Sequence, residues 1–207
     1  WRDRRLLLAG DAAHMTPPFL GQGMCAGIRD AANLAWKLRR VLDGADDALL
    51  DSYAGERRDH VRDYIEIAVR LGRVIQETDP AAARARDIRL LAAPELMHSP
   101  APRLGGHDGR AEPAGRIAPQ PVLSDGRLMD EAIGARFAVL GRAEIVGALV
   151  VEPCVAVLAD PALLPWLDAL GVGAVVLRPD RYVLGTAQSA DGVRELLRGV
   201  SHRGRTD

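Results

Sequence analysis

Residues 10–27 read GDAAHMTPPFLGQGMCAG, and this stretch decides how the first part of the chain folds. It follows a short apolar run, residues 5–9, that is typical of a buried strand ended by Gly10. Glycine, proline and threonine are frequent at positions 10–22, so we expect an irregular loop there. From residue 23 to residue 42, apolar side chains recur at the i, i+3, i+4, i+7 spacing of an amphipathic helix. The stretch therefore predicts a loop that leads from a strand end to a helix N-terminus.

Such a loop suits an extended anionic or polar ligand. The carboxylate of Asp11 can accept hydrogen bonds from sugar-like hydroxyls, and Gly21 and Gly23 allow the backbone to approach a ligand closely. The helix that begins there directs unpaired N–H groups and its positive dipole end at the ligand. A dinucleotide phosphate loop is a different motif, because it leaves its strand and enters its helix at once. Residues 10–20 intervene here, and the second Gly-x-Gly, residues 171–173, precedes a strand.

Composition excludes several classes of function. The 27 basic and 28 acidic residues nearly cancel, which gives no electrostatic case for nucleic acid or an anionic membrane surface. No uninterrupted apolar run approaches the ~20 residues that cross a bilayer. Cys25 and Cys154 form no C-x-x-C pair and have no histidines at metal-ligand spacing. We therefore expect no metal site and a reducing, cytoplasmic setting.

The remainder of the chain predicts long helices followed by a small α/β unit. Helical patterns cover residues 47–76, with a break near Gly55, and residues 80–91. Proline and glycine mark residues 98–127 as a linker or an irregular crossover. Beyond the linker, buried strands alternate with helices, which indicates a small mixed or parallel sheet. The expected strands are 137–140, 154–158, 174–177 and 182–184, and the expected helices are 161–170 and 190–197.

Residues 5–38, RLLLAGDAAHMTPPFLGQGMCAGIRDAANLAWKL, resemble the second flavin-binding signature of class A FAD-dependent aromatic monooxygenases. The resemblance is to the 3-(3-hydroxyphenyl)propionate hydroxylase-like and polyketide aromatic hydroxylase branch. GARFAVLG at 134–141 and RPD at 178–180 resemble the thioredoxin-like C-terminal domain of that branch. The resemblance implies an α/β chain: the C-terminal part of the FAD-binding domain (strand, loop, long helices), then a thioredoxin-like domain. The implied boundaries are 1–97 for the FAD-binding part with interdomain helices, 98–127 for the linker, 128–200 for the thioredoxin-like domain and 201–207 for a flexible tail.

The resemblance also implies roles for individual residues. Asp11 would hydrogen-bond the ribityl chain of FAD, Pro17 and Pro18 would shape the oxygen-reaction side of the isoalloxazine, and backbone N–H groups around Gly23 and Met24 would face its pyrimidine edge. Reduced flavin is negative at that edge, which a helix N-terminus stabilises. The implied reaction is hydroxylation of a phenolic ring with dioxygen and NAD(P)H, a transient reductant. The expected cofactor-binding set is Gly10, Asp11, Pro17, Pro18, Gly21, Gln22, Gly23 and Met24, with no catalytic residue and no metal ligand assigned.

Other conspicuous residues in this stretch have structural interpretations. We interpret His14 as a turn-stabilising or partly buried histidine, and Arg29 and Asp30 as partners of adjacent segments. Trp36 and the side chain of Met24 are interpreted as packing residues.

The two cysteines have structural interpretations as well. Cys25 is interpreted as a small buried filler. Cys154 lies in an apolar run without a vicinal cysteine, so thiol redox chemistry is not expected of the last domain. That domain is interpreted as a structural or oligomerisation module.

The sequence has no counterpart of the family's N-terminal half, in which a G-x-G-x-x-G motif binds the ADP part of FAD. We therefore expect a fragment that, in isolation, binds FAD weakly if at all and shows no hydroxylation. The expected partners are a small aromatic substrate and dioxygen, with neither nucleic acid nor membrane, and a homodimer is left open. The alternative is a catalytically silent remnant that acts as a structural or oligomerisation module through its thioredoxin-like domain.

Overall fold

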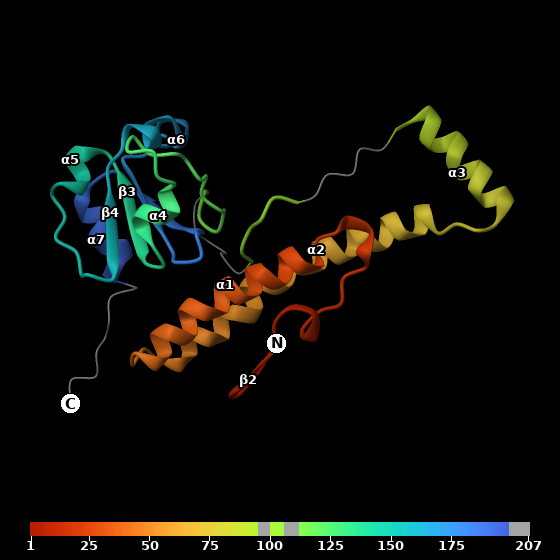
Figure 1. Ribbon diagram of the computed structural model, residues 1–207, viewed down its shortest axis with the longest axis horizontal. Helices are drawn as coiled ribbons and strands as arrows, with labels where there is room; N and C mark the ends of the chain where they lie inside the picture. The colour runs from red at the N-terminus through yellow and green to blue at the C-terminus, as the bar shows by residue number, and fades with distance from the viewer. Residues whose placement is uncertain (95–99, 106–111, 199–207) are drawn as a thin grey trace.

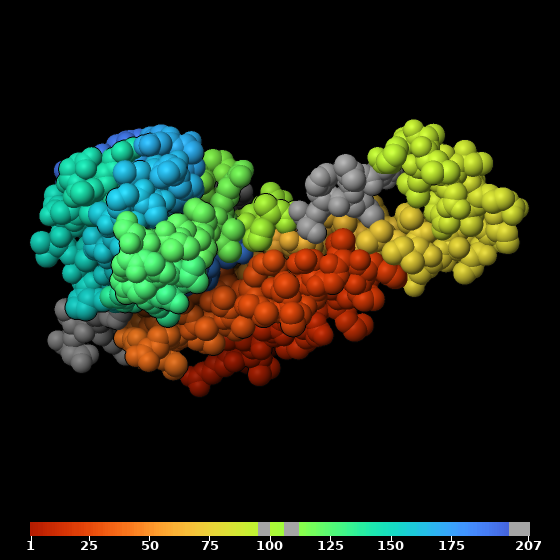
Figure 2. Space-filling model, turned by 45° about the horizontal axis from the view of Figure 1, so that its top comes forward, coloured from red at the N-terminus to blue at the C-terminus, as the bar shows by residue number. Residues whose placement is uncertain are grey.

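The computed structural model describes residues 1–94, 100–105 and 112–198 and has two parts (Figure 1). A pair of long helices forms the first part, and a sheet covered by helices forms the second. The N-terminal segment lies along the surface of the helix pair (Figure 2). The mixture of helices and strands confirms the predicted α/β class.

The N-terminal strand differs from the prediction. A two-residue strand β2 (Leu6–Leu7) pairs antiparallel with β1 (Arg2–Asp3). Leu6 is 72% exposed, so the expectation of a buried strand over residues 5–9 is wrong. Within the described part of the chain β1 is the only strand that pairs with β2, and only Leu7 of β2 packs toward the core of the helix pair. The chain then continues through two short 3-10 helices, η1 (Gly10–Ala12) and η2 (Pro18–Leu20).

Helices α1 (Gly23–Leu42) and α2 (Ser52–Ile75) pack against each other, joined through η3 (Asp47–Asp51). The bounds of α1 confirm the helix predicted from its apolar periodicity. The predicted break near Gly55 is absent, because α2 is continuous across it. Leu34 of α1, Leu50 of η3 and Tyr53 of α2 form the apolar core that closes this hairpin of helices.

Two glycines of α2 allow a matched stability test. A Cβ at Gly55 would meet no atom within 4 Å, whereas a Cβ at Gly72 would overlap the ring of Phe19. Gly55→Ala should therefore stabilise the fold by up to about 1 kcal/mol, the helical cost of glycine relative to alanine. Gly72→Ala should destabilise it by about 1–3 kcal/mol, because Phe19 would have to leave its place on the helix. Urea unfolding of both variants checks the pair, and equal effects of the two substitutions would contradict it.

Helix α3 (Pro80–Ala92) lies at the end of the molecule far from the sheet (Figure 1). Asp79 caps it, since one carboxylate oxygen accepts hydrogen bonds from the N–H groups of residues 81 and 82, and Pro80 occupies the first turn as predicted. No residue of α3 is buried, and Ile88 and Leu91 are 69% and 84% exposed. This helix therefore takes no part in a core formed by the described residues.

The predicted linker is irregular where the structure describes it. Residues 100–105 and 112–127 contain three isolated bridges, which pair Arg103 with Arg116, Ile117 with Tyr182 and Val122 with Leu128. The rest of the predicted linker, at 98–99 and 106–111, lies outside the described residues. So do the end of the first predicted domain and the predicted tail from residue 201.

The second part is a four-stranded mixed sheet in the order β4-β3-β5-β6. Strand β3 pairs parallel with β4 and antiparallel with β5, which pairs antiparallel with β6. This agrees with the predicted small sheet, although β6 is longer than expected and two short helices, α4 and α5, were not predicted. The bounds are α4 (Met129–Ile133), β3 (Phe137–Gly141), α5 (Ala143–Val146), β4 (Val155–Leu158), η4 (Pro161–Leu163), α6 (Leu164–Leu170), β5 (Ala174–Leu177), β6 (Val183–Ala187) and α7 (Ala190–Arg198).

Helices cover both faces of this sheet, because successive side chains of a strand point to opposite faces. Ala138 and Leu140 of β3 pack with residues of α4 and α6, whereas Val139 packs with residues of α5 and α7. The sheet is thus the middle of three layers. Its β5–β6 connection faces the helix pair, where the two parts of the chain meet.

Candidate functional site

The loop that carries Asp11 is held close to the start of α1. Gly10 has a positive φ of 58°, which glycine adopts without strain, and a Cβ built on Gly27 would lie 3.3 Å from the Cα of Gly10. Two glycines therefore let the loop backbone touch the helix one turn after its beginning. The side chain of Asp11 remains exposed at the surface.

The start of α1 leaves backbone donors open. Gln22 occupies the N-cap position without a side-chain cap, and the first helical hydrogen bond runs from the N–H of Ala26 to the carbonyl of Gln22. The N–H groups of Gly23, Met24 and Cys25 therefore precede the bonded part of the helix. A helix mouth of this kind attracts negative charge.

The proline pair shapes the loop before this helix mouth. Pro17 is extended, Pro18 opens η2, and Gly21 ends η2 with a left-handed φ of 61°. The structure thus brings the eight predicted cofactor-binding residues into one continuous loop and the first turn of α1.

A fully buried carboxylate fixes this loop to both long helices. Asp30 of α1 accepts hydrogen bonds from the N–H of Gly10 at 3.0 Å, from Nε2 of His14 at 2.7 Å and from Nε of Arg57 at 2.9 Å. Asp30 and Arg57 are both 0% exposed. The structural interpretations of Asp30 and His14 are confirmed. Arg57 was not predicted, and only its place in the Glu-Arg-Arg run of α2 marks it in the sequence.

Aromatic residues reinforce the same loop. The ring of Trp1 stacks on His14 with centroids 5.3 Å apart, and Trp1 also meets Tyr53 edge to face. The hydroxyl of Tyr53 donates to the carbonyl of Leu8 at 2.9 Å, and burial raises the pKa of this phenol. Tyr53 therefore acts as a neutral hydrogen-bond donor that ties the strand end to α2.

A second buried network joins the helix pair to the sheet. Both terminal nitrogens of Arg178 donate to Glu56 of α2 at 2.8 Å, and the same guanidinium donates to Asp180. Asp180 also accepts from Asn33 and Trp36 of α1, each at 3.1 Å. The Arg-Pro-Asp run of the second part thus places the arginine fork of Arg178 between two carboxylates, those of Glu56 and Asp180.

Glu56 is ionised in this network. Burial alone would raise its pKa, but the hydrogen bonds and charge of Arg178, with the charge of Lys37, outweigh burial and lower it to about 2. Lys37, itself 0% exposed, donates to Glu56 at 2.8 Å. The sequence offered no signal for these contacts, because Glu56 and Arg178 are 122 residues apart.

An apolar surface surrounds the predicted cofactor loop. Met24 and Ile28 lie four residues apart on one face of α1 and are 76% and 60% exposed. In the segment before α1, Leu6, Leu8 and Met15 are 72%, 47% and 84% exposed. Exposure of Met24 corrects the expectation that its side chain packs inside this chain. An apolar surface of this extent normally receives another protein segment or a ligand.

In the described part of the chain the cysteines are neither paired with each other nor grouped with potential metal ligands. Both cysteines are free, and burial raises the pKa of Cys154, which disfavours its thiolate. Cys154 lies just before β4 rather than inside a strand. Among the described residues, no three histidine, cysteine or acidic side chains are placed to hold a metal ion. No helix in the described ranges is both long and apolar enough to cross a membrane.

Comparison with known proteins bears directly on this site. Residues 1–68 match the family model described as "FAD binding domain". The chain is 40% identical, over 92% of its length, to a Rhodococcus jostii (strain RHA1) protein described as "Probable NADH-specific resorcinol 4-hydroxylase", of which it covers 41%. It is 36% identical, over 98% of its length, to a 3-(3-hydroxy-phenyl)propionate/3-hydroxycinnamic acid hydroxylase of Mycobacterium sp. (strain KMS), of which it covers 45%.

Solved structures agree with this match. OxyS anhydrotetracycline hydroxylase from Streptomyces rimosus superposes with a TM-score of 0.71 and 30% identity, over 95% of this chain and 44% of OxyS. The fold of the flavin-dependent monooxygenase PieE is also similar, with a TM-score of 0.72 at 24% identity.

These matches define the class of the chain as a FAD-binding flavoprotein. More narrowly, the relatives and solved structures that the chain matches are described as hydroxylases or as a flavin-dependent monooxygenase. It spans less than half the length of the curated relatives that it matches, 41% and 45% for the two named here.

Proposed function

We propose that this chain forms one side of the FAD site of an aromatic hydroxylase that uses NAD(P)H and dioxygen on a small phenolic substrate. The observation that carries the proposal is the uncapped mouth of α1 beside the exposed carboxylate of Asp11. Gly10 and Gly27 support it, because their close approach leaves the loop backbone, rather than side chains, against the helix. The residues present therefore fit the cofactor that the family implies.

Each proposed contact follows from the chemistry of the group that makes it. Asp11 would accept hydrogen bonds from the ribityl hydroxyls, and the N–H groups of Gly23 and Met24 would face the electron-rich pyrimidine edge. Pro17 and Pro18 would exclude water and limit access on the oxygen-reaction side. When bound, FAD supplies the redox chemistry that takes a hydride from the nicotinamide and delivers one oxygen atom to the ring. Asp30 holds no cofactor atom in this proposal and positions the loop through Gly10 and His14.

The exposed apolar surface around the loop supports a site completed by further polypeptide. We propose that the segment of the relatives outside the matched part packs on Met24, Ile28 and Leu6 and supplies the remaining FAD contacts. Burying this surface would contribute about 25 cal/mol for each Å² removed from water. The isolated chain should accordingly bind FAD weakly and should not hydroxylate.

The second part of the chain is proposed to be a thioredoxin-like domain without thiol chemistry. Its β-α-β unit followed by a hairpin and a helix, with sheet order β4-β3-β5-β6, supports that assignment. The assignment of the protein to the cytoplasm belongs to the same proposal. A homodimer also remains a prediction, and light scattering on the purified chain tests it.

A chimera tests the proposed function. In it, this chain replaces the segment that it matches in the Rhodococcus jostii relative, which is 40% identical over that region. We expect the purified chimera to be yellow, to carry stoichiometric FAD and to oxidise NADH in the presence of resorcinol. A chimera that folds with native circular dichroism but carries no flavin, while the relative does, would overturn the proposal and favour a structural module.

Asp11 gives a residue-level prediction in the same chimera. Asp11→Ala should weaken FAD binding by about tenfold to a hundredfold, the value of a charge-assisted hydrogen bond. Because Asp11 is exposed, unfolding of the flavin-free form should not change. Asp3→Ala, which removes another exposed carboxylate from the same segment, is the control. FAD fluorescence titration measures both, and equal affinities of the two variants would contradict the role of Asp11.

A further inference from the structure

Buried hydrogen-bond donors lack partners where α1, α2 and the β5–β6 connection meet. Arg57 and His60 are 0% exposed and Tyr182 is 2% exposed. Within the described ranges no acceptor reaches either terminal nitrogen of Arg57, either ring nitrogen of His60 or the hydroxyl of Tyr182. A terminal nitrogen of Arg29 is buried and unpartnered in the same sense. Because buried donors are normally hydrogen-bonded, this set points to a bound group.

These side chains are neighbours from three separate elements. Arg57 and His60 are one turn apart on α2, where residues three apart share a face. The ring of His60 meets Tyr64 edge to face at 4.6 Å, and the guanidinium of Arg29 lies 5.8 Å from the centre of the same ring. Tyr182 pairs through its backbone with Ile117, which lines the same cavity as His60. Burial raises the pKa of Tyr182, and the charges of Arg57 and Arg29 oppose that rise. The unpartnered donors therefore border one region.

The charge of this region is positive. Asp30 pairs with Arg57 through Nε alone and divides its other oxygen between His14 and Gly10. Burial, with the charges of Arg57 and Arg29, lowers the pKa of His60 to about 4, so His60 is neutral near pH 7. Arg57 is thus ion-paired with Asp30, whereas half-buried Arg29 makes no ion pair with a described residue, which leaves about one positive charge without a counterion.

Nearby carboxylates are engaged elsewhere. Asp63 bonds Arg103 at 3.0 Å, and Asp180 bonds Arg178 and Trp36. A single small anion would balance the charge and satisfy the donors of Arg57 and Tyr182. A divalent anion would leave one net negative charge in the region and would cost more free energy to remove from water.

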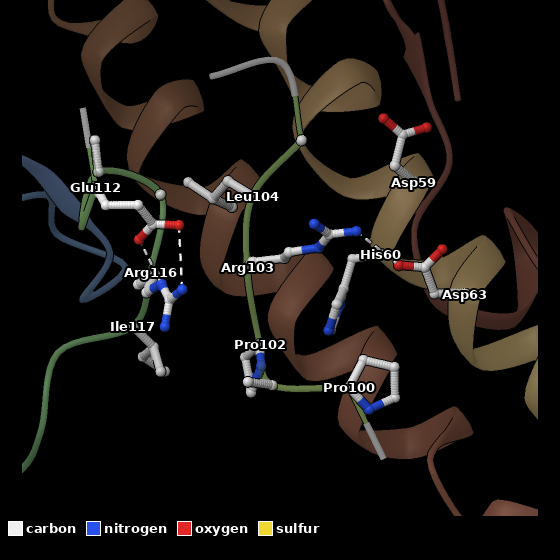
Figure 3. Close-up of a pocket in the computed structure, with 14 residues that line it drawn as sticks. Asp59, His60, Asp63, Pro100, Pro102, Arg103, Leu104, Glu112, Arg116 and Ile117 are labelled. Atoms are coloured by element: carbon white, nitrogen blue, oxygen red, sulfur yellow. Dashed lines mark hydrogen bonds and ion pairs between the residues drawn. The ribbon is translucent and has the colours of Figure 1, made fainter. Parts of the chain in front are cut away.

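A cavity gives access to the same region. A hollow of about 700 Å³ lies against α2 and is lined by Asp59, His60 and Asp63, by residues 100–105 and by residues 112 and 114–117 (Figure 3). Ile117 on its wall pairs through its backbone with Tyr182. His60 therefore borders both the cavity and the buried donors, and the cavity offers a path for a small ion.

We propose that Arg29, Arg57, His60 and Tyr182 bind a small inorganic monoanion, of which chloride is the probe. The site does not depend on FAD, although Arg57 also bonds Asp30, which holds Gly10 and His14 of the Asp11 loop. Its role is to neutralise the junction between the helix pair and the sheet. The donors come from both parts of the chain, so the ion stabilises the docked arrangement.

The test compares unfolding of the 207-residue chain in sodium chloride and in sodium gluconate at equal ionic strength. The gluconate salt at equal ionic strength controls for screening. At a chloride concentration ten times its Kd, the unfolding equilibrium constant should fall about 11-fold relative to gluconate. Diffraction from crystals soaked in bromide should show an anomalous peak beside Arg57 and Tyr182.

Two conservative variants distinguish anion binding by Tyr182 from a purely structural role of its hydroxyl. Tyr182→Phe removes one donor and should weaken the chloride effect about tenfold or more in apparent affinity. Tyr64→Phe removes a hydroxyl that donates to the carbonyl of Pro100 at 2.6 Å, so it should lower stability equally in both salts. Unfolding that is the same in chloride and gluconate, with Tyr182→Phe more stable than the parent, would overturn the proposal. That result would mean that the hydroxyl of Tyr182 binds no anion.

Discussion

Arg178→Ala is expected to lower the free energy of unfolding by about 3–5 kcal/mol, because it leaves the buried carboxylate of Asp180 without its cation and removes one of the two cations, Arg178 and Lys37, that bind Glu56. Arg178 makes four hydrogen bonds of 2.7–3.0 Å, two to Glu56 and two to Asp180. These carboxylates come from α2 and from the sheet part, so the loss falls on the junction between the two parts. We therefore expect the sheet part to detach before it unfolds.

Limited proteolysis and urea unfolding together measure this effect. Cleavage in the linker should accelerate in Arg178→Ala, while the sheet part persists as a resistant fragment. Arg194→Ala is the matched control, since Arg194 pairs with Asp191 one turn away on the exposed face of α7. Similar proteolysis of the two variants would show that Arg178 does not hold the parts together.

The acid sensitivity of the same junction has a defined sign. The folded-state pKa of Glu56 is about 2, below the value near 4.3 of an unfolded glutamate. Its contribution is therefore fully present above about pH 4.3 and is lost as the pH falls toward 2. Glu56→Gln removes this term, so its stability should fall less steeply than that of the parent between pH 4 and pH 2.

The sequence predicted regular elements better than it predicted contacts. The helix at Gly23–Leu42 was predicted to its end residues, because a 20-residue apolar stripe and an Asp-Gly end are local signals. The strand at residues 5–9 was predicted as buried, since an apolar run does not reveal whether a second layer covers it. Leu6 is exposed because the described residues provide only β1 as a neighbour.

The candidate site divides in the same way. Glycine and proline signals located the loop from Gly10 to Met24, since they act through backbone geometry within a few residues. The buried ion pairs could not be predicted from one sequence, because the partners of Arg57 and Arg178 are fixed by packing across 27 and 122 residues. Charged residues are common on helix surfaces, so Glu56-Arg57-Arg58 gave no sign of which two would be buried.

Asp30→Asn is the second substitution with a large expected effect, and it should lower the free energy of unfolding by about 3–5 kcal/mol. The substitution keeps the shape of the side chain but removes the charge that Arg57 faces in a fully buried setting. The amide that replaces the carboxylate has a single oxygen with two lone pairs. It can therefore accept from at most two of the three donors, which belong to Gly10, His14 and Arg57. The loop that carries Asp11 should loosen, so FAD binding in the chimera should fall although Asp30 touches no cofactor atom.

A double-mutant cycle separates the buried charge from a general packing defect. Removing both partners, in Asp30→Asn with Arg57→Met, should restore part of the stability lost in Asp30→Asn alone, because no uncompensated cation remains. Asp59→Asn serves as the control, since Asp59 is exposed on α2 and pairs with Arg62 at 3.6 Å. Strictly additive losses across the cycle would show that Asp30 and Arg57 act independently. In that case the loop would be held by the contacts of Asp30 with Gly10 and His14 rather than by its charge.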